Sequence, residues 1–141
     1  MRIEILYHSD IERISQRANG DWLDLRAAGR VEFSAGEHKL ISLGVSMRLP
    51  AGYEAHVAPR SSTFKHWGLL QTNSPGIIDE SYAGPEDIWF FSAYATRPTV
   101  VEKNDRICQF RLVKKMPQPD LCEVEHLSGP SRGGHGSSGK L

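Results

Sequence analysis

The sequence has 141 residues, which fits one domain, and a globular chain near this size buries roughly 68–70% of its unfolded surface. Hydrophobic residues make up 39% and charged residues 24%, and 17 Lys and Arg balance 17 Asp and Glu. A net charge of zero argues against a general binder of nucleic acid or of membrane surfaces, although it permits a small anionic ligand.

The sequence predicts neither a signal peptide nor a membrane span. The residues after Met1 are mixed in polarity, and the longest apolar run, 88–95, is too short to cross a bilayer. Cys108 and Cys122 have no C-x-x-C spacing, so we expect neither a disulfide framework nor a zinc site. Both cysteines are predicted to lie buried or half-buried in strands of a cytoplasmic protein.

Short strands separated by turn residues are predicted over most of the chain. Apolar residues alternate in the first segment, 3–7, and residues 9–12 resemble a helix-capping box, so at most one short helix is expected there. Further strands are expected at residues 45–49, 53–57, 88–95, 107–113 and 121–127. Seven prolines between Pro59 and Pro130 interrupt any longer helix. The pattern is typical of an all-β sandwich or barrel.

The last fourteen residues, 128–141, differ in composition, because nine of them are Gly or Ser. Such a segment buries too little apolar area to order alone, so we divide the chain into a β-barrel domain, 1–127, and a flexible arm, 128–141. Residues 134–139 match G-x-G-x-x-G, but the chain ends before a helix can follow, so a dinucleotide fold is not supported. Closely spaced glycine amides and Arg132 still suit phosphate oxygens, and a tail without a role is the alternative.

Five segments carry the most specific information, and they are GDWLDLRA (20–27), APRSS (58–62), NSPGIIDESY (73–82), DRICQF (105–110) and RGGHGSSG (132–139). In order and spacing they resemble the motifs of the homotrimeric all-β dUTPase family, and most closely its bacterial and phage branch. The resemblance implies a jelly-roll-like distorted β-barrel that assembles as a closed trimer with active sites at subunit interfaces. It also implies that the arm of one subunit closes over a site built by its neighbours.

The same resemblance implies an enzyme that hydrolyses dUTP to dUMP and pyrophosphate with Mg²⁺ and an activated water, which limits uracil in DNA and supplies dUMP for dTMP synthesis. Asp79 is the expected general base, with a turn-capping aspartate as the alternative. Tyr82 is expected beneath the deoxyribose, where its ring leaves no room for a ribose hydroxyl, unless it is a core tyrosine. The uracil edge is expected to bind at a hairpin that includes Asn73, Gly76 and Ile78.

The phosphate chain is expected to bind residues from the second, fourth and fifth motifs, namely Arg60, Ser61, Ser62, Gln109, Arg132, Gly136 and Ser137. Asp24 is expected to hold Mg²⁺ through water, or to have a structural role instead. His135 stands where the family commonly has a phenylalanine over uracil, and an imidazole would stack with a strength that depends on its protonation. Residues 83–87 replace the commoner basic ending of the third motif.

Three other functions remain open at this point. A dCTP deaminase shares the fold, but it would need a base-facing carboxylate on the strand after Asp79, where the chain has IWFF at 88–91. A regulatory protein that senses dUTP or docks a protein partner is a second class. A structural protein without a ligand is the third.

Overall fold

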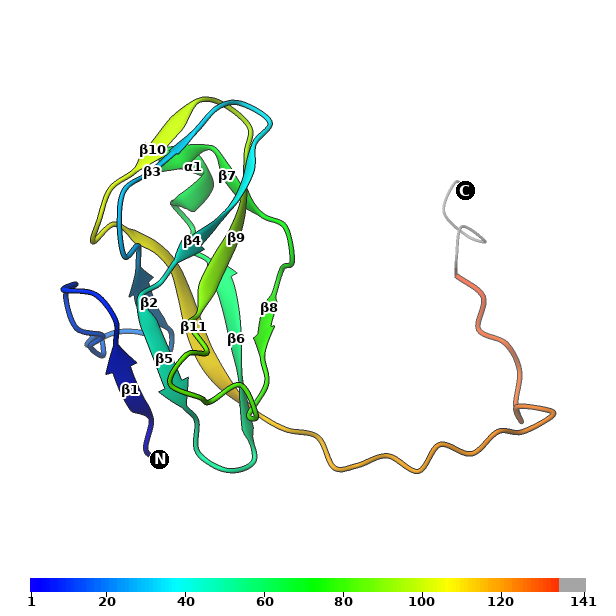
Figure 1. Ribbon diagram of the computed structural model, residues 1–141. Coiled ribbons are helices and arrows are strands. Elements are labelled where there is room, and N and C mark those ends of the chain that lie inside the picture. Colours follow the sequence, from blue (N-terminus) through cyan, green and yellow to red (C-terminus); the bar gives the residue numbers. More distant parts are fainter. Residues whose placement is uncertain (135–141) are drawn as a thin grey trace.

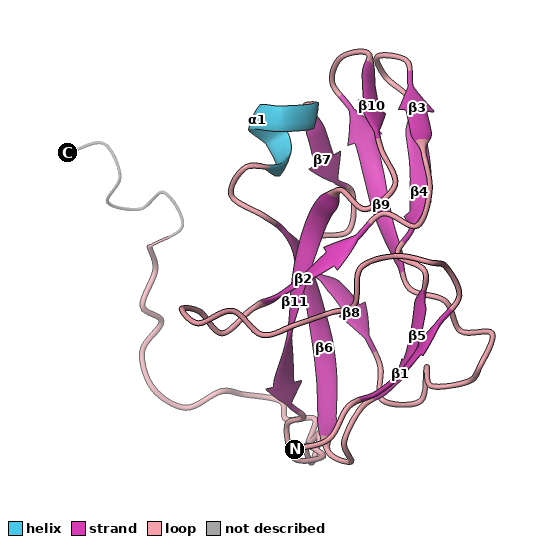
Figure 2. Ribbon diagram, turned by 90° about the vertical axis from the view of Figure 1, so that its left-hand side faces the viewer, coloured by secondary structure: helices cyan, strands magenta, loops and turns pink. Residues whose placement is uncertain are grey.

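The computed structural model describes residues 1–134, and its strands are short and joined by turns (Figures 1 and 2). The elements in chain order are β1 (Glu4–Tyr7), β2 (Leu23–Arg26), β3 (Val31–Phe33), β4 (His38–Ser42), β5 (Val45–Arg48), β6 (Tyr53–Pro59), α1 (Thr63–Trp67), β7 (Leu69–Gln71), β8 (Gly76–Ile78), β9 (Phe90–Ala95), β10 (Thr99–Val101) and β11 (Arg106–Lys114).

In the described residues, all the strand pairs are antiparallel and form four sheets. A four-stranded sheet has the order β2-β11-β6-β8, a three-stranded sheet has the order β4-β9-β7, and β1-β5 and β3-β10 are two-stranded. The predicted all-β class with at most one short helix is confirmed. Within residues 1–134, the hydrogen-bonded ladders do not close into one barrel.

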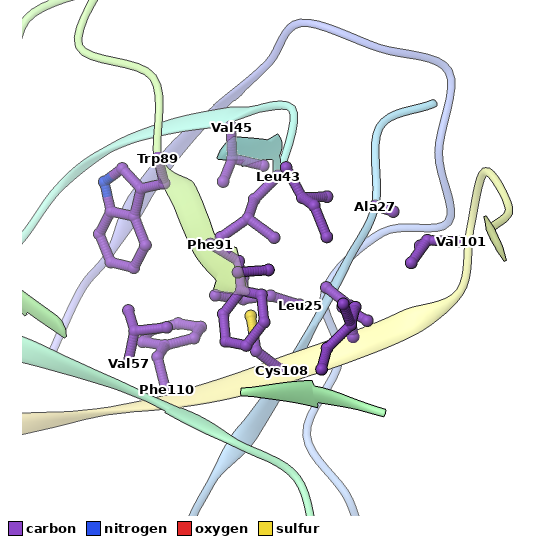
Figure 3. Close-up of a cluster of buried hydrophobic side chains, with 14 of the residues drawn as sticks. Leu25, Ala27, Leu43, Val45, Val57, Trp89, Phe91, Val101, Cys108 and Phe110 are labelled. Atoms are coloured by element: carbon purple, nitrogen blue, oxygen red, sulfur yellow. The ribbon is translucent and has the colours of Figure 1, made fainter. Parts of the chain in front are cut away.

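The core lies between the four-stranded and three-stranded sheets. Alternate residues of a strand point to opposite faces of its sheet, so every second side chain can be buried in the core. Phe91, Ala93 and Ala95 of β9 and Val57 of β6 are all buried, while their neighbours along the strands are more exposed. Figure 3 shows the buried aromatic side chains of this cluster together with Cys108. The ring of Trp89, just before β9, meets the ring of Phe110 on β11 edge to face, with 5.3 Å between the ring centres. Aromatic packing therefore contributes to the contact between the two sheets.

The expected strands at 3–7, 45–49, 53–57 and 107–113 correspond to β1, β5, β6 and β11 within about one residue at most ends. The expected strand at 88–95 begins two residues later, at Phe90. The expected strand at 121–127 is wrong, because these residues are exposed and unpaired. Apolar residues alternate in this segment, but no described strand lies beside it to pair with, and a single strand is not stable alone.

The predicted helical turn at residues 9–12 is wrong, and tertiary contacts explain why. The backbone N–H of Glu12 donates to Asn104 Oδ1 at 2.9 Å, and that of Ile14 donates to the Tyr7 hydroxyl at 2.8 Å. These amides therefore bind distant partners in place of helical carbonyls. The expectation of a strand position for Cys108 is confirmed, but Cys122 is exposed in an irregular segment.

The helix that does form, α1, was not predicted. It ends at Gly68, which has a left-handed φ of 64° and donates its N–H to Phe64 O at 2.7 Å. A β-carbon at this position would lie 2.8 Å from Arg97 Nε, so glycine is required for space as well as for conformation. Arg97 donates to the oxygens of Lys65 and His66, which satisfies the last carbonyls of the helix. In residues 1–134, α1 is far too short to cross a membrane.

Candidate active site

A cleft of about 300 Å³ lies where the third motif leaves β8 and returns to β9. Its walls come from two short segments, and the lining residues are Ile77, Ile78, Asp79, Tyr82, Ile88, Trp89 and Phe90. The lining is mostly apolar, with one carboxylate and one phenol. A mostly apolar cleft with a few polar groups is typical of a site for a small ligand.

Asp79 follows β8 directly, and a local turn holds its carboxylate. Ser81 donates to Asp79 Oδ1 twice, from its backbone N–H at 2.8 Å and from its hydroxyl at 2.7 Å. These two hydrogen bonds, the backbone one first, lower the pKa of Asp79. Asp79 therefore does cap its own turn, but the capping hydrogen bonds use only Oδ1. The carboxylate is exposed and ionised at neutral pH.

Tyr82 is fixed at the far side of the same turn. Its N–H donates to Asp79 O at 3.0 Å, and its hydroxyl donates to Ile88 O at 2.8 Å. The residue is 38% exposed, so it is not a core tyrosine. The two hydrogen bonds tie both ends of the tyrosine and set its ring as one wall of the cleft.

The loop between β7 and β8, which joins the three-stranded sheet to the four-stranded one, is packed closely around Gly76. A β-carbon on Gly76 would lie 3.0 Å from Gln71 Nε2 and 3.7 Å from Asn73 Nδ2. Gln71 Nε2 donates to Val57 O at 3.1 Å, which fastens the loop to β6. Asn73 and Gly76 thus lie close together, although the expected hairpin is instead a loop between two sheets, and Ile78 lines the cleft directly.

A second cluster surrounds Asp24 on β2, and it combines the expected Asp24 and Arg60 with two further arginines. Arg17 pairs with Asp24 Oδ2, Arg60 Nε lies 3.1 Å from Oδ1, and Arg106 Nη1 lies 3.6 Å from Oδ2. The Asp24 side chain is only 13% exposed. One nearly buried carboxylate therefore faces three guanidinium groups, which leaves a positive surplus suited to an anion.

The surroundings of Asp24 Oδ1 are relevant to the expected binding of Mg²⁺ through water. It is buried and accepts no hydrogen bond within residues 1–134, because the contact with Arg60 Nε is an ion pair without hydrogen-bond geometry. An acceptor without a donor is compatible with a water-held metal, but the three guanidinium groups oppose a cation, so indirect Mg²⁺ binding by Asp24 stays a prediction. No group of three His, Cys, Asp or Glu residues in the described chain forms a protein-only metal site.

The second motif forms a turn in front of α1. Thr63 Oγ1 accepts from the Arg60 N–H at 2.9 Å and donates to Ile107 O at 3.0 Å, so a buried threonine fastens this turn to β11. The Ser61 hydroxyl forms no hydrogen bond with the described residues and is exposed, and Ser62 precedes the first residue of α1. Both hydroxyls are therefore open to a ligand.

Gln109 connects the second motif with Asp24. It lies opposite Asp24 on β2 and opposite Ala58 on β6, and its Nε2 donates to Pro59 O at 3.0 Å. Asp24, Arg60 and Gln109 are therefore brought together, as the resemblance implies. Their common setting is the β2-β11-β6 part of one sheet.

The two clusters do not meet within one chain. Asp24 lies on β2 and Asp79 follows β8, and these strands are the opposite edges of the four-stranded sheet. Three strand spacings separate the edges, or about 14 Å. Arg132 lies in the exposed segment after β11, which runs away from both sheets (Figure 1). His135, Gly136 and Ser137 lie outside the described residues.

Several site residues were missed by sequence reasoning. Trp89 and Phe90 line the cleft, although the continuous apolar run at 88–91 was interpreted as a plain strand. Phe90 is 42% exposed, whereas the adjacent Phe91 is fully buried. The alternation inside the run was the available signal. Thr63 and Arg17 left no signal, because both lie just outside the five motifs and their contacts form only in the folded chain.

A family model and a curated relative both match nearly the whole chain. A family model described as dUTPase matches residues 8–139. The SPbeta prophage-derived deoxyuridine 5'-triphosphate nucleotidohydrolase YosS of Bacillus subtilis (strain 168) is 58% identical over 140 residues, which are 99% of each chain.

Two solved phage structures share the fold. A mutant of the Staphylococcus bacteriophage 80alpha dUTPase with dUpNHpp has a TM-score of 0.80, 19% identity and 98% coverage of both chains. A mutant dUTPase from phage phi11 of S. aureus, whose structure reveals the coordination of a structural Mg(II) ion, has a TM-score of 0.76 and 17% identity, covering 89% of this chain and 98% of the other. From the family match and the identity to YosS, the chain belongs to the dUTPase family.

Proposed function

We propose that this protein is a dUTP diphosphatase, which hydrolyses dUTP to dUMP and pyrophosphate. The observation that carries the proposal is the cleft in which an ionised Asp79 and the fixed ring of Tyr82 meet an apolar floor. A flat base and a deoxyribose match these walls in size and polarity. The nucleotidohydrolase name of the relative at 58% identity agrees with this assignment.

In the proposed reaction, Asp79 removes a proton from the water that attacks the α-phosphorus. Its free oxygen, Oδ2, is the acceptor, because both hydrogen bonds from Ser81 occupy Oδ1. The low pKa keeps the carboxylate in the form that accepts the proton. The new bond joins the water oxygen to the α-phosphorus, and pyrophosphate leaves with the electrons of the broken bridge.

The phosphate chain would bind at the Asp24 cluster, with Arg60 and the hydroxyls of Ser61 and Ser62. Gln109 keeps its amide oxygen available to order a water, since its Nε2 is used by Pro59. Mg²⁺ would be held through water on Asp24 Oδ1, and it would neutralise charge on the phosphate oxygens. Arg132, His135, Gly136 and Ser137 of the arm are assigned to the far phosphates and the base.

The complete site would be shared between subunits of a homotrimer. The cleft, the Asp24 cluster and Arg132 occupy three separate parts of one chain, which supports a site assembled from more than one copy. A closed threefold assembly provides three such shared sites. Residues 128–141 act as the arm that covers the neighbouring site, in a cytoplasmic enzyme.

The decisive test is pyrophosphate release from a panel of dNTPs and UTP with Mg²⁺, for wild type and Asp79→Asn. We expect dUTP-selective turnover that falls by roughly 10²–10⁴-fold in the variant. Glu80→Gln is the matched control, because it neutralises the next carboxylate, which accepts from the Gly52 N–H instead. Equal rates for wild type and Asp79→Asn would reject the assignment. Ammonia from dCTP would indicate a deaminase, and tight dUTP binding without turnover would indicate a sensor.

A further inference from the structure

A second, smaller cleft of about 90 Å³ borders the Asp24 cluster on the side of the loop before β2. Its walls are rich in arginine, and the lining residues are Arg13, Ile14, Ser15, Arg17, Asp24, Arg26 and Arg106. Four guanidinium groups here face one carboxylate. Residues 13–17 precede the first of the five motifs, so no role is assigned to this loop by the resemblance.

Two of the four arginines are used by the fold itself. Arg13 donates to Ile11 O at 3.0 Å, and its guanidinium lies 4.1 Å from the centre of the Tyr7 ring. Arg26 donates to Asn104 O at 2.9 Å and pairs with Glu12 at 2.7 Å. These two side chains have partners that hold the loop in place, and they have few donors left for a ligand.

Arg17 and Arg106 differ from them. Among the described residues, the guanidinium group of each forms an ion pair only with Asp24 Oδ2. A guanidinium has five N–H donors, so most of them remain available. Their side chains are 43% and 49% exposed, so the remaining donors face the cleft and solvent. Asp24 is nearly buried and orients both, and its other oxygen faces Arg60 of the expected phosphate site.

We propose that Arg17 is a further phosphate-binding residue of the active site, and that Asp24 positions it. The proposal rests on the dUTP diphosphatase function, because Arg60 extends the same cluster towards the second motif. A planar fork with unused donors suits the oxygens of the β- and γ-phosphates and of the product pyrophosphate. Because Arg17 is assigned to the two outer phosphates and not to the one next to the sugar, dUMP binding should not depend on Arg17.

The competing explanation is an ordinary surface ion pair between Arg17 and Asp24. Exposed ion pairs contribute little to stability, and one without a ligand role would leave nucleotide binding unchanged. Arg111 provides a matched control on the same protein. It pairs with Asp21 at 2.9 Å, and its side chain has the same 43% exposure as that of Arg17.

The experiment compares wild type with Arg17→Ala, Arg17→Lys and Arg111→Ala. Pyrophosphate binding is measured by calorimetry with Mg²⁺, and KM for dUTP and the inhibition constant of dUMP are measured by turnover. We expect Arg17→Ala to weaken pyrophosphate binding and raise KM by about 5- to 20-fold, with the dUMP constant changed less than about 2-fold. Arg17→Lys should recover part of the loss, and Arg111→Ala should match wild type.

The inference is overturned if Arg17→Ala binds pyrophosphate like wild type, or if the dUMP constant changes as much as the pyrophosphate constant. Failure of wild type to bind pyrophosphate at all also overturns it. Failure of the proposed function gives a different result, namely absence of dUTP turnover in wild type. Calorimetry with pyrophosphate does not need turnover, so it tests Arg17 in either case.

Discussion

Ser81 donates both its backbone N–H and its hydroxyl to a single oxygen of Asp79, at 2.8 and 2.7 Å. The turn therefore fixes the carboxylate and leaves the other oxygen unused. It also lowers the pKa of Asp79, because both hydrogen bonds favour the ionised form. A residue two positions along the chain thus sets both the orientation and the ionisation of the proposed base.

Ser81→Ala should move the acidic limb of the pH–rate profile to higher pH. The substitution removes the hydroxyl hydrogen bond and keeps the backbone one, so the pKa of Asp79 rises towards its ordinary value. A base acts when deprotonated, so kcat/KM then falls earlier as the pH is lowered, with little change near neutral pH. Glu80→Gln is the control. If the acidic limb is the same in Ser81→Ala and in wild type, the ionisation of Asp79 does not control the rate at low pH.

Phe90→Ala and Phe91→Ala should have opposite consequences, although the residues are adjacent. Phe91 is fully buried, so its truncation should lower the free energy of unfolding by about 3–5 kcal/mol. Phe90 is 42% exposed and lines the cleft, so its truncation should cost about 0.5 kcal/mol or less and raise KM for dUTP by about 5- to 30-fold. Chemical denaturation and steady-state kinetics check the pair. A Phe91→Ala protein as stable as wild type would contradict the core role of Phe91, and an unchanged KM in Phe90→Ala would contradict the cleft role of Phe90.

The longer strands could be predicted because their periodicity is local. In β6 and β11, buried residues such as Val57 and Phe110 alternate with more exposed ones, and a period of two needs only the chain itself. Three-residue strands such as β7 and β8 have too few positions to show a period. The apolar alternation near Leu121 misled for the opposite reason, since it has no neighbouring strand in residues 1–134.

The site could be predicted as a set of residues, but its contacts could not. The motifs brought Asp79 and Tyr82 to one loop, whereas the hydrogen bond from Tyr82 to Ile88 depends on how that loop returns to β9. The ion pair of Arg17 with Asp24 likewise needs the loop before β2 to fold over the sheet. Tertiary partners also decided against the expected helix at residues 9–12.

Tyr82→Phe should reduce discrimination between dUTP and UTP while it keeps the ring. The variant loses the hydrogen bond to Ile88 O, which contributes roughly 1 kcal/mol, and the freed ring can yield to a ribose hydroxyl. We expect the ratio of kcat/KM for dUTP over UTP to fall about 5- to 10-fold. Tyr94→Phe, on an exposed ring of β9, is the control. If Tyr82→Phe keeps the wild-type ratio, the hydroxyl does not position the ring for selectivity.

Removal of residues 128–141 should impair catalysis without destabilising the fold. The described part of this segment, 128–134, is exposed and adds no buried apolar area, so the free energy of unfolding should stay within about 0.5 kcal/mol of wild type. The loss of Arg132 and the arm should lower kcat/KM by at least about 100-fold. Full-length Arg132→Ala isolates the contribution of the guanidinium. A shortened protein with full activity would show that the tail has no role.

Mixing two inactive variants tests whether the site is shared between subunits. Asp79→Asn and Arg132→Ala chains, unfolded together and refolded at equal amounts, form mixed oligomers. If each site takes position 79 from one chain and position 132 from another, about one quarter of the sites regain both native residues. If both positions come from the same chain, every site lacks one residue and no activity returns. The recovered dUTP turnover, relative to each variant refolded alone, therefore distinguishes a shared site from a site within one chain.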